Sequence, residues 1–171
     1  MMLLRGIMGQ MLRNKDKQLV RSSIKKEDKI MNISTPDGVR DYLPSEVKAH
    51  DALGNKLSSL YQKWGYEQVI TPTLEYEESL RHALGETMAR QCISFSDESG
   101  NKLMLRPDHT TPIARVAATR LQDSTKPVRL YYSGSVFRKS NTQEGVEIFQ
   151  SGVELIGGNT IENDAEVIML C

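Results

Sequence analysis

The stretch that decides the fold spans residues 131–158 and reads YYSGSVFRKSNTQEGVEIFQSGVELIGG. Alternating apolar and polar residues predict two strands, over residues 128–139 and 146–156, joined by a short polar loop. A loop of that length makes the two strands neighbours, so we expect them to pair as an antiparallel hairpin.

Polar side chains lie at regular spacing on this predicted hairpin. Side chains of a strand alternate between its two faces, so Gln150, Gly152 and Glu154 are expected on one face. Arg138 stands at the end of the first strand, where its planar fork suits a phosphate or a carboxylate. This pattern predicts a sheet face that binds a small polar ligand, where Gly152 leaves space between the polar side chains of Gln150 and Glu154. The pattern leaves open an alternative, an exposed polar sheet face without a ligand.

Composition narrows the class of protein. The chain has 171 residues, of which 39% are hydrophobic and 26% charged, as expected for one globular domain with a real core. No apolar run is long enough to cross a membrane. Two isolated cysteines and three histidines without ligand spacing predict neither disulfides nor a metal site, and we expect no cofactor. This cysteine usage fits a reducing cytoplasm, where we expect the protein to act.

Charge is distributed unevenly along the chain. Residues 1–31 carry eight basic and three acidic side chains, a balance of +5. The whole chain has 22 of each, so the other 140 residues hold 14 basic and 19 acidic side chains, a balance of −5. The body therefore offers no broad attraction to nucleic acid. We interpret residues 1–33 as a basic tail, either an organelle-targeting peptide or sequence upstream of a true start at Met31, and residues 34–171 as the domain.

The rest of the chain alternates helical patterns with short strands. Turn residues and apolar periodicity divide it into elements. The predicted elements are a helix over 46–64 with Ser45 as its cap, a strand over 66–71, a helix over 74–84, a hairpin over 92–96 and 102–106, a helix from 108 or 110 to 121, and a helix from 161. We therefore predict an α+β fold with an antiparallel sheet flanked by helices. The last helix has no C-terminal cap, which suggests a truncated chain.

Four motifs in order resemble the catalytic core of class II aminoacyl-tRNA synthetases, in the histidyl branch. They read GVRDYLP at 38–44, GYEQVITP at 65–72, LRPDHT at 105–110, and FR at 137–138 followed by FQSGVELIG at 149–157. Two kinds of protein share this pattern. One is histidyl-tRNA synthetase, and the other is the regulatory subunit of ATP phosphoribosyltransferase, a paralogue that does not charge tRNA.

In two stretches, the sequence resembles the regulatory subunit more than it resembles the synthetase. The stretch LRPDHTTPIARVAATRL at 105–121 resembles the regulatory version, whereas the synthetase usually has Glu and Gly where Asp108 and His109 stand. The loop over 139–148 contains no arginine, although the synthetase uses arginines there to hold ATP and the tRNA acceptor end. Many regulatory subunits keep an arginine in this loop, so the loop alone does not separate the two.

The resemblance implies a pocket for histidine. It assigns ligand contacts to Asp108, Thr110, Gln150 and Glu154, and a further role near the pocket to Arg138. An ammonium group requires carboxylates, and hydroxyl and amide groups add neutral hydrogen bonds. The alternatives are that Asp108 and Thr110 only cap the helix that follows Pro107, and that Arg138 holds an inner acidic residue.

His109 has no obvious carboxylate partner in the sequence, so we expect a surface histidine at the start of a helix. Tyr61 and Leu57 are expected in the core or a dimer interface, together with Trp64.

By resemblance, the expected function is a non-catalytic subunit that assembles with catalytic ATP phosphoribosyltransferase in the first step of histidine biosynthesis. Histidine is the expected effector, and residues 46–72 are expected to mediate self-association. The alternative is a fragment of histidyl-tRNA synthetase, or a remnant of either protein without function. Neither a membrane nor a nucleic acid is an expected partner of the regulatory subunit.

Overall fold

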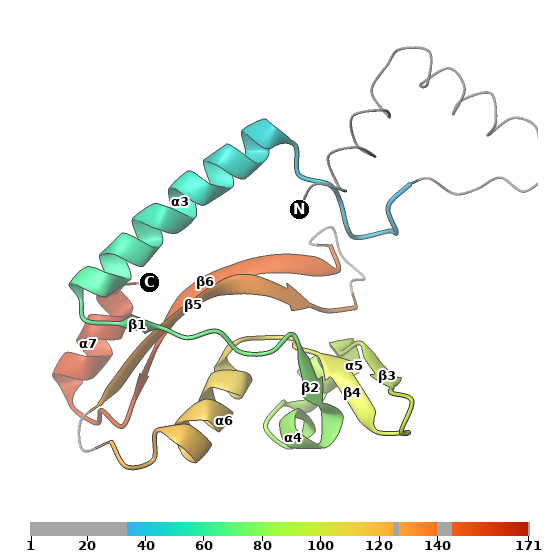
Figure 1. Ribbon diagram of the computed structural model, residues 1–171. Coiled ribbons are helices and arrows are strands. Elements are labelled where there is room, and N and C mark those ends of the chain that lie inside the picture. The colour runs from blue at the N-terminus through green and yellow to red at the C-terminus, as the bar shows by residue number, and fades with distance from the viewer. Residues whose placement is uncertain (1–33, 125–126, 140–144, 171) are drawn as a thin grey trace, which may run out of the picture. The chain divides into compact units, whose positions relative to one another are not determined.

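The computed structural model describes residues 34–124, 127–139 and 145–170. The chain divides into two compact units, residues 1–35 and 36–171, and the second unit carries the helices and strands in Figure 1. The predicted basic tail over 1–33 and the tip of the central loop at 140–144 lie outside the described residues. No helix in the described part is long and apolar enough to cross a bilayer.

The predicted central hairpin is confirmed. Strand β5 (Val128–Phe137) pairs antiparallel with β6 (Glu147–Ile156) along its whole length. A third strand, β1 (Glu67–Gln68), pairs with β5 in parallel, so this sheet has the order β1-β5-β6 and is mixed. The predicted antiparallel hairpin therefore carries one parallel edge strand, β1, which is joined to it through the long connection between residues 68 and 128.

Helices α3 (Pro44–Lys63) and α7 (Ile161–Leu170) cover one face of this sheet (Figure 1). Their contacts with it form a core of Tyr61, Tyr66, Tyr131 and Leu170, against which Leu57 and Val153 pack. Tyr61 and Leu57 are core residues as expected, whereas Trp64 is 39% exposed. Three of the four buried residues in this core are tyrosines, and the Tyr61 ring of α3 packs against the Tyr131 ring of β5. This aromatic contact joins α3 to the hairpin.

The start of α3 differs from the prediction. Leu43, rather than Ser45, occupies the cap position, and the Glu46 carboxylate accepts a hydrogen bond from the Leu43 N–H at 2.9 Å. Pro44 explains the difference, since proline lacks an N–H and its fixed φ favours the first helical position. Ser45 is therefore already inside the first turn.

A second sheet has the order β2-β4-β3 and is antiparallel throughout. The predicted hairpin is confirmed as β3 (Ser94–Ser96) and β4 (Lys102–Leu105). The predicted helix over 74–84 was wrong at its start, where β2 (Leu74–Tyr76) precedes α4 (Glu77–Arg81), and α5 (Glu86–Gln91) was not predicted. A tertiary contact overrides the helical pattern, because Glu75 is buried and paired with Arg115 at 2.6 Å.

The segment between the two sheets is held by Arg106, at the end of β4. The guanidinium is buried and donates to the Thr71 carbonyl at 2.7 Å and to the Ser135 carbonyl at 2.8 Å. This explains why the strand predicted over 66–71 is short: after Val69 donates to the Tyr131 carbonyl, the chain leaves β5 and is bound by Arg106 instead. Helix α6 (Thr110–Arg120) follows directly and ends one residue before the predicted Leu121.

Candidate functional site

The candidate site lies where the start of α6 meets the face of the hairpin opposite α3. Strand register places Gln150 beside Gly134, Gly152 beside Tyr132, and Glu154 beside Leu130. Paired residues share a face of the sheet, so the predicted grouping of Gln150, Gly152 and Glu154 agrees with this register. Helix α6 contacts the same strand β6.

Thr110 and Glu154 are brought together across 44 residues of sequence. The Thr110 hydroxyl donates to Glu154 Oε1 at 2.7 Å, which connects the first residue of α6 to β6. The bond is solvent-accessible, so its energy is modest, but it fixes the direction of a carboxylate at the edge of the site. A carboxylate carries a second oxygen, and this group is suited to accept a hydrogen bond from an ammonium ligand.

Asp108 acts as a helix cap. Its Oδ1 accepts a hydrogen bond from the Thr111 N–H at 2.9 Å, and its Oδ2 lies 3.4 Å from the Thr111 hydroxyl. These bonds satisfy a free N–H group of the first turn, which is what a capping carboxylate provides. These contacts direct the Asp108 carboxylate to the first turn of α6, as the capping alternative expects, and the histidine contact assigned to Asp108 stays a prediction.

Arg138 is held by the backbone. Its Nε donates to the Pro107 carbonyl at 2.7 Å, and its own N–H donates to the Val146 carbonyl at 2.9 Å. Within the described residues, this guanidinium bond goes to a main-chain oxygen and not to the inner acidic side chain considered above. Arg138 therefore connects the end of β5 to the segment that carries Asp108 and Thr110.

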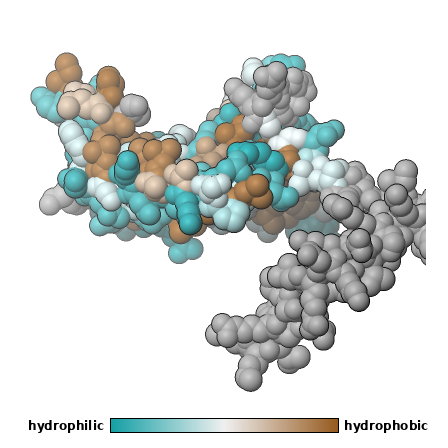
Figure 2. Space-filling view, turned by 90° about the horizontal axis from the view of Figure 1, so that it is seen from above, coloured by the Kyte–Doolittle hydropathy of each residue, from teal (hydrophilic) through white to brown (hydrophobic). Residues whose placement is uncertain are grey.

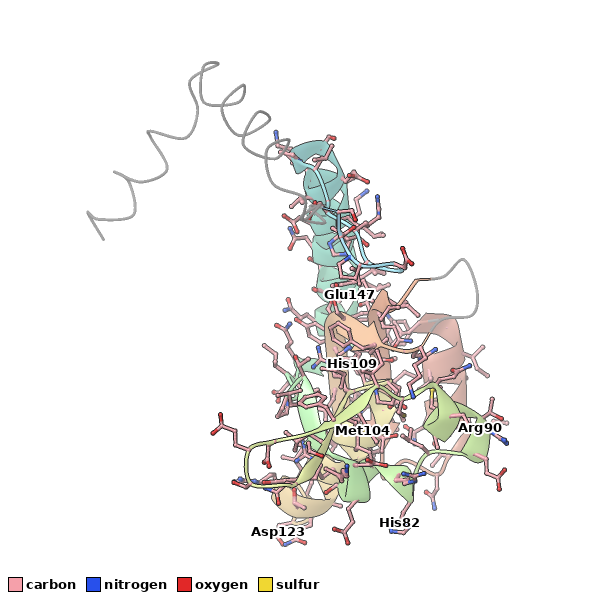
Figure 3. All side chains as sticks on the ribbon, turned by 90° about the vertical axis from the view of Figure 1, so that its right-hand side faces the viewer. His82, Arg90, Met104, His109, Asp123 and Glu147 are labelled. Atoms are coloured by element: carbon pink, nitrogen blue, oxygen red, sulfur yellow. The ribbon has the colours of Figure 1, made fainter. Side chains whose placement is uncertain are left out.

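His109 corrects the prediction of a surface histidine, because it is only 3% exposed. His109 is labelled in Figure 3, and its Nε2 lies 3.1 Å from the Gly134 carbonyl. Its ring stacks on Tyr132 at 4.5 Å between centroids. Burial lowers the pKa of His109, and the nearby Arg106 charge lowers it further, while the Gly134 carbonyl and Asp108 act in the opposite direction. A neutral imidazole therefore fills the space between α6 and the sheet.

The predicted glycine gap is occupied. A Cβ atom built on Gly152 would lie 2.6 Å from the Tyr132 hydroxyl and 2.9 Å from the carbon that bears it. The Tyr132 ring therefore lies across Gly152, between Gln150 and Glu154, and its other side is stacked by His109. Sequence reasoning missed this contact, although an aromatic residue paired with a glycine across two strands is a known signal.

The site therefore has a closed aromatic floor and a polar rim. Tyr132 and His109 form the floor, while Thr110, Gln150 and Glu154 supply hydroxyl, amide and carboxylate groups around it. Such a rim is suited to bind an amino group. In the described residues, no group of three His, Cys, Asp or Glu side chains gathers as a metal site.

Known proteins resemble this chain over most of its length. The family model described as histidyl-tRNA synthetase matches residues 38–171. An ATP phosphoribosyltransferase regulatory subunit of Synechococcus sp. (strain JA-3-3Ab) is 44% identical over 143 residues, which cover 81% of this chain and 35% of that protein. A histidine–tRNA ligase of Thermococcus kodakarensis is 38% identical over 135 residues, covering 78% of this chain and 31% of the ligase.

A solved structure agrees with these relatives. The crystal structure of an "ATP phosphoribosyltransferase regulatory subunit/histidyl-tRNA synthetase" from Bacillus halodurans C superposes with a TM-score of 0.75 at 38% identity, covering 84% of this chain and 37% of that one. The chain spans about a third of the length of the curated relatives it matches. The predicted class II synthetase-like fold and the resemblance to the regulatory subunit are both confirmed, and the chain belongs to the histidyl-tRNA synthetase family.

Proposed function

We propose that this chain forms part of a non-catalytic regulatory subunit of ATP phosphoribosyltransferase, which serves the first step of histidine biosynthesis and its feedback control. Relatives named as that subunit are 43–45% identical to the chain, whereas the histidine–tRNA ligase of Thermococcus kodakarensis is 38% identical. Residues 1–33 would be an appendage to the domain, and the protein would act in the cytoplasm.

The observation that carries the proposal is the Thr110–Glu154 pair above an aromatic floor. It offers a directed carboxylate for the amino group of histidine, and Gln150 lies on the same face of β6. The loop over 139–148 contains no arginine, which leaves the site without the phosphate donors of that loop in a synthetase. Binding without adenylate formation is what a histidine sensor requires.

The histidine site is tested by calorimetric titration of the Glu154→Ala variant. We expect affinity for histidine to fall by about tenfold or more, because a bound ammonium loses its charged partner. Glu147→Ala is the matched control, since Glu147 lies on the same strand but on the opposite face. A folded Glu154→Ala protein with unchanged affinity would rule out this pocket.

Self-association is the second part of the proposal. Leu53, Leu60 and Trp64 are spaced along one side of α3 and are 58%, 40% and 39% exposed. Figure 2 shows hydrophobic residues gathered at the left-hand end of the molecule, the end at which Figure 1 shows α7 and the C-terminal part of α3. An apolar stripe of this kind on a long helix marks a protein interface, and we assign it to a second copy of the chain.

The interface is tested by sedimentation of the Leu53→Glu/Leu60→Glu double variant. We expect it to sediment as a monomer, whereas Lys48→Glu/Asn55→Glu, at exposed positions on the opposite side of the same helix, should leave the assembly intact. A double variant that still self-associates at the same concentrations would show that another surface is used.

The rival function is that of a histidine–tRNA ligase, favoured by the family model and by the ligases among the relatives. It is tested by ATP–pyrophosphate exchange with histidine. We expect no exchange above the background without protein. Exchange that depends on the chain and on histidine would replace the regulatory proposal with the ligase.

A further inference from the structure

A pocket lies on the reverse face of the same hairpin, away from the candidate site. Its volume is about 230 Å³, and the described residues that line it are Tyr42, Val47, His50, Ser135, Glu147 and Phe149. Ser135 and Phe149 are paired across β5 and β6. Because strand side chains alternate, odd-numbered residues of β6 face this pocket while Gln150 and Glu154 face the candidate histidine site.

Aromatic rings form the walls of this pocket. His50, on α3, meets the Phe149 ring edge-on at 4.1 Å between centroids and an interplanar angle of 80°. Tyr42 follows at 6.3 Å from His50. The Val146 N–H donates to the Gly38 carbonyl at 2.6 Å, which holds the segment leading to Tyr42 against the end of the hairpin. The N-terminal part, with Tyr42 and His50, and strand β6, with Phe149, therefore contribute rings to one pocket.

The charges around these rings favour a cation. The Glu147 carboxylate stands among the lining residues, near the loop end of the hairpin (Figure 3). The Arg40 guanidinium lies 4.2 Å from the centre of the Tyr42 ring and is neutralised by Glu46 at 2.6 Å. The Tyr42 ring thus already makes one cation–π contact and the Arg40 charge is balanced, while Glu147 is the acidic side chain among the described residues that line the pocket.

The size of the pocket limits its ligand. A volume of 230 Å³ is below the range of about 300–1,000 Å³ that holds drug-sized molecules, so the pocket accepts one small head group. Rings that meet edge-on surround a rounded group better than a flat one, which favours an alkylammonium over a planar guanidinium. We propose that the pocket formed by Tyr42, His50, Phe149 and Glu147 binds the head group of a small alkylammonium compound.

The test is an NMR titration of the full ¹⁵N-labelled chain with choline and with 3,3-dimethylbutan-1-ol, its uncharged isostere. We expect choline to shift the amides of Ser135 and Phe149 with about millimolar affinity, since exposed cation–π contacts are individually weak. The isostere should bind at least about fivefold more weakly, which corresponds to about 1 kcal/mol.

The Glu147→Gln variant separates charge from shape. We expect this variant to lose most of the preference for choline, whereas Glu98→Gln, an exposed acid in the turn between β3 and β4, should keep it. Three results would each overturn the proposal: no shift at Ser135 and Phe149, equal binding of choline and its isostere, or a full preference for choline in Glu147→Gln.

Discussion

The contact between Tyr132 and Gly152 yields a sharp prediction for the Gly152→Ala variant. The new methyl group would lie 2.6 Å from the Tyr132 hydroxyl, about 0.8 Å inside the distance of 3.4 Å at which ordinary contact begins. Tyr132 has little room to retreat, because His109 is stacked on it at 4.5 Å. Overpacking of this kind costs about 2 kcal/mol of unfolding free energy, which lowers the Tm of a chain of this size by about 4–8 °C.

Thermal unfolding followed by circular dichroism measures this effect. Gly54→Ala is the control, since a Cβ at this helical position meets nothing within 4 Å and should stabilise the chain slightly. In a Tyr132→Leu background, Gly152→Ala should have an effect below about 0.5 kcal/mol, because the clashing ring is gone. A Gly152→Ala chain with wild-type Tm and Tyr132 intact would refute the placement of the ring over the glycine.

Three further predictions concern single side chains. Burial lowers the pKa of His109, so stability should be complete above about pH 6.5 and fall as pH drops toward the folded pKa; urea titrations from pH 7 to pH 5 should show a flatter profile for His109→Phe. Arg106→Lys should lower the unfolding free energy by about 2–3 kcal/mol in urea, because a lysine cannot bond both main-chain carbonyls that Arg106 joins; an unchanged midpoint would contradict this role. The bond to Arg129 lowers the pKa of Glu166, so Glu166→Gln should destabilise the chain by about 1 kcal/mol at pH 7, and the difference should shrink as pH falls from about 4.5 through the lowered pKa of the folded chain; a constant difference would exclude the ion pair.

Strong local patterns predicted the fold well. The β5–β6 hairpin and helix α7 follow from period-two and helical spacing that tertiary contacts reinforce. Predictions were wrong where distant residues decide the conformation. The pairing of buried Glu75 with half-buried Arg115 turns the start of an expected helix into β2, and Arg106 ends the pairing of β1 early. Neither partner is near in sequence to the residues it constrains.

The candidate site was predicted in part. Alternation placed Gln150 and Glu154 on one face, and their register agrees. The same alternation could not show that Tyr132 covers Gly152, because this depends on how two strands align. His109 was placed at the surface because only its neighbours in sequence were considered, whereas its partner is the carbonyl of Gly134 in another element.

Activation of a catalytic subunit tests the central claim most directly. The chain would be mixed with a short-form catalytic ATP phosphoribosyltransferase, and phosphoribosyl-ATP formation would be measured with and without histidine. The regulatory account predicts activation that histidine reverses, and loss of this reversal in Glu154→Ala, since histidine must favour the state that binds it more tightly. A folded chain that neither activates the catalytic subunit nor confers sensitivity to histidine would contradict it.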